Sequence, residues 1–525
     1  MSDFKFKSTV DPKQLAKVFM PAAKQWSKNM PVEQFAQVQS KILVDFVLGG
    51  RPGRAYYLEA PNGDIAASVI VTHHKGFYKE PTRGMSSAIP DPTTFGVSPA
   101  TGLLVSYVVT AQEYRGQGLM RKLLERVISH TEEELLQKEL AKSSDGKDSF
   151  RSMVTSEGKV DRTLANYYMS KKYVWYLYSG IDRTYEKFGF KAYPLDGYKI
   201  PISAGNSEVG QLVKKLLSNS ASEAGVGKKL RLLDRSKKSD LDLISFILQG
   251  RELDLLTDLN TDDFHSELSG GRRSSSSLTN IGSALLTTEK GSTNELSAIS
   301  EKLEHVTITP SSRRKSSIQH MAVPKFGLQP NMDSLDSNFV NDKILCEAGS
   351  VKEYTNICGA ILTNELQQKS FYILWTSVMM SQVHIVGVGE LKLDVFGALV
   401  DPLGLTNPPQ RRRGSSFTGL NDISGLNLQD LDLLVSTALH VANKRRFKGM
   451  SSYVCVTKND LPATVPAAVL HDFFMNYVSS GEKSKAVEFV QDFSSQHILP
   501  MLRKFGSSNP EFELDWTSNS MLSWG

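Results

Sequence analysis

Hydrophobic and polar positions follow two different periods within the stretch 103–130, LLVSYVVTAQEYRGQGLMRKLLERVISH. Its first part, 103–109, is a nearly continuous apolar run, which is typical of a buried strand. Its last part has apolar residues at the spacing of an amphipathic helix, namely Leu119, Leu123, Leu124, Val127 and Ile128. Gly116 and Gly118 lie between the two parts. The pattern therefore predicts a strand, a tight turn that contains glycine, and a helix.

This predicted turn is suited to binding an anion. Glycine allows the backbone to approach a ligand closely. The first amides of a helix have no internal partner, and the helix dipole adds positive potential at that end, so phosphate is the natural ligand. The stretch lacks the Lys-Ser or Lys-Thr ending of a P-loop. It also lacks the three glycines and the distant acidic residue of a dinucleotide-binding fingerprint.

The same periodicity predicts the elements on either side of the turn. In the first 205 residues we expect helices at 11–27 and 32–47 and strands at 54–59, 65–73 and 173–179. Asn62-Gly63 between the first two strands is a strong hairpin signal. After the last strand, Asp182 is suited to cap a short helix and Gly189 to end it. These elements predict an α/β domain.

Two short motifs resemble those of a known family. The segment from Arg115 to Leu119 matches the pattern R-x-x-G-x-[GA] of the GCN5-related N-acetyltransferases (GNATs), and Met120 departs from its last position. The string YEKFGF at 185–190 resembles the second signature of this superfamily, Y-E-K-x-G-F. The resemblance covers about residues 10–203. It implies a GNAT core, in which helices flank a mixed, twisted sheet.

The resemblance also implies a cofactor and a set of site residues. Acetyl-CoA would be the co-substrate, with its pyrophosphate in the Gly-containing turn, and no metal is expected. The residues assigned to the cofactor are Val108, Val109, Arg115, Gly116, Gln117, Gly118, Leu119 and Met120. Tyr185 stands where family members place the tyrosine that gives a proton to the leaving thiolate. The alternative for Tyr185 is a packed aromatic side chain.

Acetyl transfer to an amine also needs a base, because the side chain of free lysine has a pKa of about 10.4 and only the neutral amine attacks. The strand 103–109 carries no carboxylate, although several family members keep one there. Glu59 and His73 are the candidates, and His74 is an alternative to His73 because adjacent strand residues face opposite sides. A backbone amide of Val108–Thr110 could stabilise the oxyanion.

A narrower resemblance concerns the acceptor. The segment 177–202, LYSGIDRTYEKFGFKAYPLDGYKIPI, is similar to fungal acetyltransferases that act on the ε-amine of free lysine, which also have a long C-terminal extension. This implies N-acetylation of free lysine or a related small amine. Two alternatives stay open. One is acetylation of a protein lysine, and the other is a regulatory protein that binds acetyl-CoA with little or no catalysis.

Composition changes along the chain and predicts three parts. These are an acetyltransferase core at 1–205, a helical and then Ser-rich disordered linker at 206–341, and a C-terminal α/β domain at 342–525 that could be a degenerate GNAT-like fold. Basic residues precede Ser275, Ser316 and Ser415 in Arg-Arg-containing segments. These serines are candidates for phosphorylation by a basophilic kinase, and solvated basic turns are the alternative.

Length and charge exclude some classes of protein. The chain has 525 residues, of which 40% are hydrophobic, so it can form two or three globular domains. Its net charge of +5 does not indicate nucleic-acid binding. Three cysteines without metal-ligand spacing fit a reducing compartment. No signal peptide or apolar run of membrane-spanning length is recognised, so we expect a cytoplasmic protein, with the nucleus as the alternative.

Overall fold

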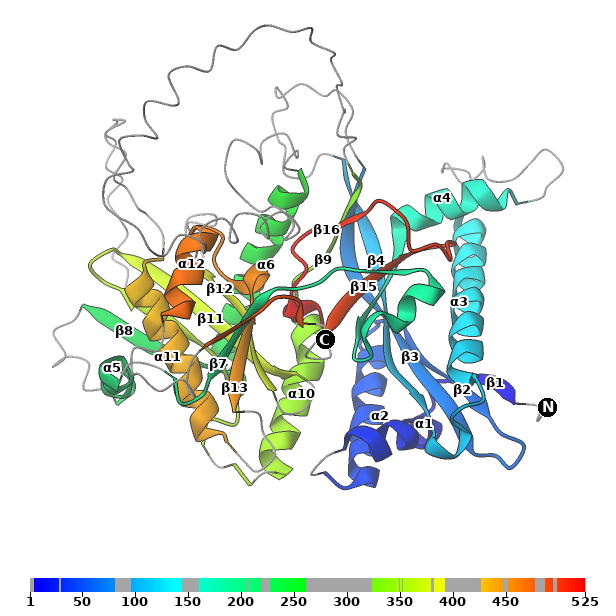
Figure 1. The fold of residues 1–525 in the computed structure, drawn as a ribbon, viewed down its shortest axis with the longest axis horizontal. Helices are drawn as coiled ribbons and strands as arrows, with labels where there is room; N and C mark the ends of the chain where they lie inside the picture. Colours follow the sequence, from blue (N-terminus) through cyan, green and yellow to red (C-terminus); the bar gives the residue numbers. More distant parts are fainter. Residues whose placement is uncertain are drawn as a thin grey trace, which may run out of the picture.

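The computed structural model describes residues 4–27, 30–80, 96–143, 160–204, 207–218, 227–260, 323–348, 350–351, 353–378, 382–391, 426–446, 452–476, 487–493 and 498–524. Two β-sheets lie side by side, each with helices on both faces (Figure 1). Both sheets are mixed, because each contains parallel pairing among antiparallel neighbours. The expected α/β architecture is confirmed, including an α/β region in the C-terminal part.

The first sheet combines strands from both ends of the chain. Its order is β1 (Lys5–Thr9), β2 (Gly53–Glu59), β3 (Ile65–Lys79), β4 (Val97–Thr110), β5 (Tyr173–Ser179), β15 (Leu499–Lys504) and β6 (Phe190–Ala192). Within this order only β4 and β5 are parallel. At the far end of β3, β9 (Lys325–Leu328) adds a further strand, which pairs with β16 (Asp515–Trp516).

Helices cover both faces of the first sheet because its strands alternate their apolar side chains. Along β2, Tyr56 and Leu58 pack toward α3 (Leu119–Ser143), whereas Ala55 and Tyr57 pack toward α1 (Pro12–Trp26) and α2 (Val32–Leu48). The short helix η1 (Gln112–Tyr114) precedes α3, and α4 (Arg162–Lys172) and η3 (Asp182–Phe188) lie on the α3 face. Asp11 caps α1 by accepting a hydrogen bond from the amide of Gln14 at 2.9 Å.

The second sheet is built on the same plan. Its order is β14 (Glu488–Val490), β7 (Gly197–Pro201), β13 (Tyr453–Thr457), β12 (Gln382–Glu390), β11 (Lys369–Val378), β10 (Ile357–Asn364) and β8 (Lys228–Asp234). One face packs against α5 (Ser207–Leu217), α11 (Leu428–Lys444) and α12 (Ala467–Met475). The other face packs against α6 (Lys238–Asn260), α10 (Asp333–Ala348) and the C-terminal η11 (Met521–Trp524), and η8 (Lys458–Asp460) follows β13.

The two sheets with their helices, hereafter the first and second units, repeat one order of elements. Strand β8 corresponds to β1, α6 and α10 to α1 and α2, β10–β12 to β2–β4, α11 to α3, and β13 to β5. Each unit then receives one strand from the other. Strand β15, near the C-terminus, lies between β5 and β6, whereas β7 lies between β13 and β14. The units are therefore linked by a reciprocal exchange of strands.

This exchange crosses the boundaries predicted at residues 205 and 341. Strand β7 precedes the first boundary yet belongs to the second sheet, and β15 follows the second boundary yet belongs to the first sheet. Residues 228–260 were assigned to the linker, but they form β8 and α6 of the second unit. Strand β9 lies within the segment that was expected to be disordered. Ser275, Ser316 and Ser415 lie outside the described residues.

Candidate active site

Strands β4 and β5 separate near the middle of the first sheet. Their parallel pairing runs from Thr101, opposite Tyr173, to Leu104, opposite Tyr176. Beyond this point β4 continues to Thr110 and β5 to Ser179, without further pairing between these two strands. Their facing backbone groups are therefore open to a ligand that lies between the strands. The predicted strand at 103–109 forms one wall of this opening.

A β-bulge lies on β4 just beyond the separation. Ser68 and Ile70 of β3 face Val109 and Ser106 of β4, so β4 has one extra residue in this interval. Tyr107 within it has φ 50°, the left-handed region that side chains other than glycine rarely adopt. Bulges turn the local backbone and its amides away from the regular ladder. The amides of Val108 and Val109 therefore lie in the part of β4 where regular pairing is disturbed.

The Gly-containing turn connects β4 to α3 as predicted. Gly116 and Gly118 have φ 79° and 69°, and the structure leaves open space where a Cβ would be at each position. Glycine is thus needed here for its backbone conformation, not for lack of room. The first helical bond runs from the amide of Lys122 to the carbonyl of Gly118 at 3.2 Å. The amides of the preceding helical residues, Leu119–Arg121, have no carbonyl within α3 to bond.

Arg115 stabilises this turn from the side. Its Nε donates to the carbonyl of Thr110 at 3.3 Å, and its Nη2 donates to Oε1 of Gln25 on α1 at 2.9 Å. Nearby, Glu113 lies 3.7 Å from Lys24. The guanidinium therefore holds the end of β4 and α1 together. In this arrangement Arg115 shapes the turn, and the backbone amides of Gly116 to Arg121 are the groups offered to a phosphate.

Met120 does not fill the turn. Its side chain is partly buried and packs against the apolar core between the sheet and α3, to which Leu119 and Val108 also contribute. The departure from the R-x-x-G-x-[GA] pattern is therefore accommodated in the core. Gly116, Gln117 and Gly118 remain exposed.

Tyr185 lies on η3, on the same face of the sheet as α3. Its side chain is 6% exposed and packs against Phe188 and Phe190, with ring centroids 6.3 and 6.2 Å away. Burial raises the pKa of Tyr185 to about 12, so its hydroxyl is protonated at neutral pH. Gly189 ends η3 in the left-handed conformation, as predicted, and starts β6. The structure brings Tyr185 and the cofactor candidates Val108, Leu119 and Met120 into one apolar core.

The candidate bases lie apart from the bulge. His73 pairs with Leu103, four residues before Tyr107, so it is roughly 13 Å away along the strand. Burial lowers the pKa of His73 to about 4 and that of His74 to about 3. Glu59 lies two strands from β4 and is held by Lys7, whose Nζ donates to its two oxygens at 2.7 and 2.9 Å. The structure therefore does not bring Glu59 or His73 together with Tyr185.

The corresponding helix start in the second unit is closed by the chain itself. Asn427 caps α11, and the buried carboxylate of Asp430 accepts from Asn427 at 2.9 Å and from Asn364 at 3.1 Å. Lys228 lies 2.7 Å from the same carboxylate. A negative group thus lies in the first turn of α11, where it interacts favourably with the helix dipole. The first turn of α3, by contrast, carries no acidic side chain.

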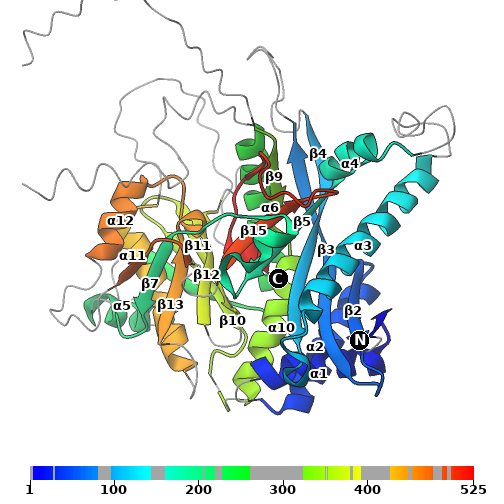
Figure 2. The ribbon, with the colours of Figure 1, turned by 45° about the vertical axis from the view of Figure 1, so that its right-hand side comes forward.

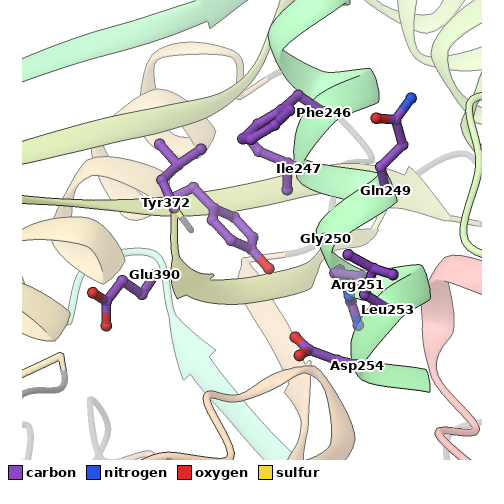
Figure 3. Close-up of a pocket in the computed structure, with 10 residues that line it drawn as sticks. Phe246, Ile247, Gln249, Gly250, Arg251, Leu253, Asp254, Tyr372 and Glu390 are labelled. Carbon is purple, nitrogen blue, oxygen red and sulfur yellow. The ribbon is translucent and has the colours of Figure 1, made fainter. Parts of the chain in front are cut away.

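The bulge of the second unit is also occupied. Arg251 on α6 donates to the carbonyl of Val386, the extra residue of β12, and lies 3.5 Å from Asp460. Beside it is a cavity of about 30 Å³, into which Tyr372 and Asp254 project (Figure 3). A space of this size holds one or two water molecules. It is too small for the pantetheine arm of a cofactor.

A larger cavity, of about 340 Å³, lies beside the middle of α3. It is bounded by α3, α4, the end of η3 and the turn after β15. Its lining begins at Glu125 on α3, so it starts roughly 9 Å along the helix from Leu119. This cavity is therefore separate from the Gly-containing turn.

Two features are absent from the described part of the chain. No group of three or more His, Cys, Asp or Glu side chains gathers there in an arrangement that could hold a metal. Within the same part of the chain, none of the helices combines the length and apolar character needed to cross a bilayer.

Sequence reasoning did not identify the residues that shape the bulge. Tyr107 belongs to the apolar run that predicts a regular strand. Nothing in the sequence indicates that this tyrosine adopts a left-handed conformation. Gln39 and Asn341, which form a chain of hydrogen bonds to Tyr107, come from two helices far apart in the sequence. The contribution of β15 likewise depends on a pairing that no local pattern predicts.

Comparisons with known proteins gave likenesses of structure alone. No protein-family model matches the chain, and no curated protein matches it. A GCN5-related N-acetyltransferase from Kribbella flavida is 10% identical, with 95% of this chain and 72% of that chain covered and a TM-score of 0.33. One from Sphaerobacter thermophilus is 10% identical, with 98% of each chain covered and a TM-score of 0.31.

A GNAT family N-acetyltransferase (YhbS) from Escherichia coli, solved in complex with CoA, is 11% identical, with 36% of this chain and 70% of that chain covered and a TM-score of 0.18. These scores are low.

Proposed function

We propose that the chain is an N-acetyltransferase of the GNAT superfamily, which moves the acetyl group of acetyl-CoA to a primary amine. The observation that carries this proposal is the direct connection between two features. The opening between β4 and β5 leads along β4 into the turn at Gly116–Gly118, where the amides that start α3 are free. A long ligand with a phosphate at one end and a thioester at the other fits an opening that leads into such a turn.

The reaction can be described with the groups of this chain. The pyrophosphate of acetyl-CoA would accept from the amides of the turn and of Leu119–Arg121, and its pantetheine arm would lie between β4 and β5. A neutral amine attacks the thioester carbonyl, and an amide of the β4 bulge, at Val108 or Val109, stabilises the oxyanion that forms. The nitrogen of the tetrahedral intermediate then loses a proton to water, the C–S bond breaks as the intermediate collapses, and the thiolate takes a proton. Tyr185 is the proposed donor of that proton.

The acceptor proposed is a small amine, with free lysine as the first choice. Two observations support a small acceptor over a protein. The face of the first sheet that carries α1 and α2 is also contacted by α10 of the second unit (Figure 2). On the same face Trp516 packs against Tyr176 and Tyr178 of β5 at centroid distances of 5.9 and 6.0 Å. A covered face leaves little room for an extended peptide.

A second candidate is a regulatory protein that binds acetyl-CoA without turnover. The observation that favours it is the placement of the candidate bases, because Glu59 is paired with Lys7 and His73 lies far from the bulge. The two functions share the cofactor site and differ in turnover. Isothermal titration with CoA, combined with an assay of thiol release across free amino acids, polyamines and lysine peptides, distinguishes them. Failure of CoA to bind would exclude both.

A further inference from the structure

The strained residue at the β4 bulge is held by contacts on several sides. The ring of Tyr107 packs edge-on against Phe19 and Trp26 of α1, at centroid distances of 5.3 and 6.1 Å. Its hydroxyl donates to Oε1 of Gln39 on α2 at 2.7 Å. A left-handed tyrosine persists only where its surroundings impose that conformation. The aromatic contacts fix the position of the Tyr107 ring, and the hydrogen bond fixes its hydroxyl group.

The hydrogen bond continues into the second unit. Nε2 of Gln39 donates to Oδ1 of Asn341 on α10 at 2.7 Å, and the Gln39 side chain is 3% exposed. Both ends of the Gln39 amide are therefore used, one by the bulge and one by the second unit. If Asn341 did not accept, the buried Nε2 would lose its partner and the amide would be free to turn.

Helix α10 lies along α2, as both views of the fold show (Figures 1 and 2). The two helices are also joined just after the C-terminal end of α2, where Arg51 lies 3.0 Å from Asp333. The interface thus has two polar links. One leads through Gln39 to Tyr107, and the other, between Arg51 and Asp333, does not contact the bulge.

We propose that Asn341 of the second unit is a positioning residue for acetyl transfer in the first unit, because the chain Asn341–Gln39–Tyr107 holds the β4 bulge and so aims its amides at the thioester carbonyl. This inference rests on the proposed function. It gives the second unit a specific part in the reaction. Asn341 contacts neither cofactor nor acceptor in this proposal and acts through the bulge.

The test uses three variants of the full chain. Asn341→Leu removes the acceptor at similar volume, whereas Asn341→Asp keeps an acceptor oxygen for Gln39. Asp333→Asn is the matched control, because it weakens the other α2–α10 link and leaves the chain to Tyr107 intact. Hydrogen exchange of the peptide that spans residues 104–110 is measured for each without any ligand. Affinities for CoA and acetyl-CoA, kcat and KM follow.

The proposal expects faster exchange at 104–110 in Asn341→Leu only. It also expects kcat to fall about 10- to 100-fold, the range caused by a small misplacement of a reacting group. The affinity for CoA should stay within twofold of the wild type, because the Gly-containing turn is not affected, and the preference for acetyl-CoA over CoA should decrease. In Asn341→Asp the exchange rate at 104–110 and kcat should both stay at their wild-type values.

Three results would overturn the proposal. The first is unchanged exchange at 104–110 in Asn341→Leu. The second is an equal loss of kcat in Asp333→Asn, which would indicate a general effect of the interface. The third is normal kcat despite faster exchange. If wild-type protein binds no CoA at all, the proposed function fails together with the catalytic part of this inference, and the exchange data alone then report whether Asn341 holds the bulge.

Discussion

Arg503 on β15 and Glu132 on α3 form a largely buried pair across 371 positions of sequence, with Nη1 and Oε1 2.5 Å apart. The same oxygen of Glu132 accepts from the indole of Trp175 and from the amide of Gly506, both at 3.0 Å. Nε of Arg503 donates to the carbonyl of Phe188 at 2.9 Å. The pair therefore fastens the strand that the C-terminal part donates to the first sheet.

Replacement of Arg503 is expected to destabilise the whole chain. In Arg503→Leu the carboxylate of Glu132 loses its buried partner, and such a change costs about 3–5 kcal/mol. Chemical unfolding followed by circular dichroism measures the free energy. Arg162→Leu is the control, because Arg162 pairs at 2.7 Å with Glu133, the neighbour of Glu132, but both side chains are solvent-exposed. That exposed pair should contribute about 0–1 kcal/mol. Equal effects of the two replacements would contradict the fastening role of Arg503.

The Gly-containing turn can be tested with two matched glycines. Gly118 and Gly63 both have positive φ, 69° and 85°, with open space where a Cβ would be. An alanine at either position is strained by a similar amount, about 1 kcal/mol. Only Gly118→Ala should weaken CoA binding, by about tenfold or more in isothermal titration. The account of the turn would be wrong if Gly63→Ala, in the β2–β3 hairpin, weakened binding to the same extent.

Buried histidines should make the chain sensitive to acid. His384 is 1% exposed, both ring nitrogens lack a partner among the described residues, and burial lowers its pKa to about 3. In the unfolded chain the pKa is about 6.5, so below that pH the unfolded state binds more protons. Stability from this group is present above pH 6.5 and is lost as pH falls toward 3. At pH 5 the loss amounts to about 2 kcal/mol.

His384→Leu tests this sign. The difference in unfolding free energy between pH 7 and pH 5 should be smaller in the variant by about 2 kcal/mol, because its unfolded state no longer binds a proton at position 384. The same difference in wild type and variant would show that His384 does not titrate as described. His73 and His74, whose pKa values are also lowered, should leave part of the acid sensitivity in the variant.

Deprotonation of Tyr185 should cause no fall in the turnover rate below about pH 11. Burial raises the pKa of Tyr185 to about 12, so the donor stays protonated through the range in which the amine becomes neutral. The rate with a lysine-like acceptor should therefore rise with pH from 7 to 10 without a fall, because the free amine has a pKa of about 10.4. Stopped assays from pH 7 to 10, within the range of protein stability, check this. A fall between pH 8 and 9 that Tyr185→Phe abolishes would contradict the assignment.

The sequence indicated the parts of the site that depend on local patterns. The apolar run at 103–109, the glycines at 116 and 118, and the helix from Leu119 follow from spacing and backbone conformation, and all three are present. The end of η3 at Gly189 was also visible locally, but the predicted cap is wrong, because Asp182 is the first residue of η3 and makes no side-chain cap. Local patterns thus located the turn and the end of η3, whereas the role of Tyr185 comes from the family resemblance.

The remaining features depend on contacts between distant segments. Asn341 and Tyr107 lie far apart in the sequence, and two hydrogen bonds through Gln39 join them only in three dimensions. The exchange of β7 and β15 also depends on distant contacts, because nothing in the local sequence of either strand shows that it pairs in the other unit. By sequence, Asp430 is an ordinary acidic residue in the first turn of a helix. Its partners Asn364 and Lys228 come from distant strands and are known only from the structure.

Acetyl transfer in the first unit, with Tyr185 as the proton donor, is best tested by turnover of the full chain. Thiol release from acetyl-CoA is followed with free lysine as acceptor for wild type and Tyr185→Phe, with CoA affinity measured for both. The account predicts turnover by the wild type, a loss of about 10²-fold or more in kcat in the variant, and equal CoA affinity. CoA binding without turnover by any amine would contradict it, and so would full activity of Tyr185→Phe.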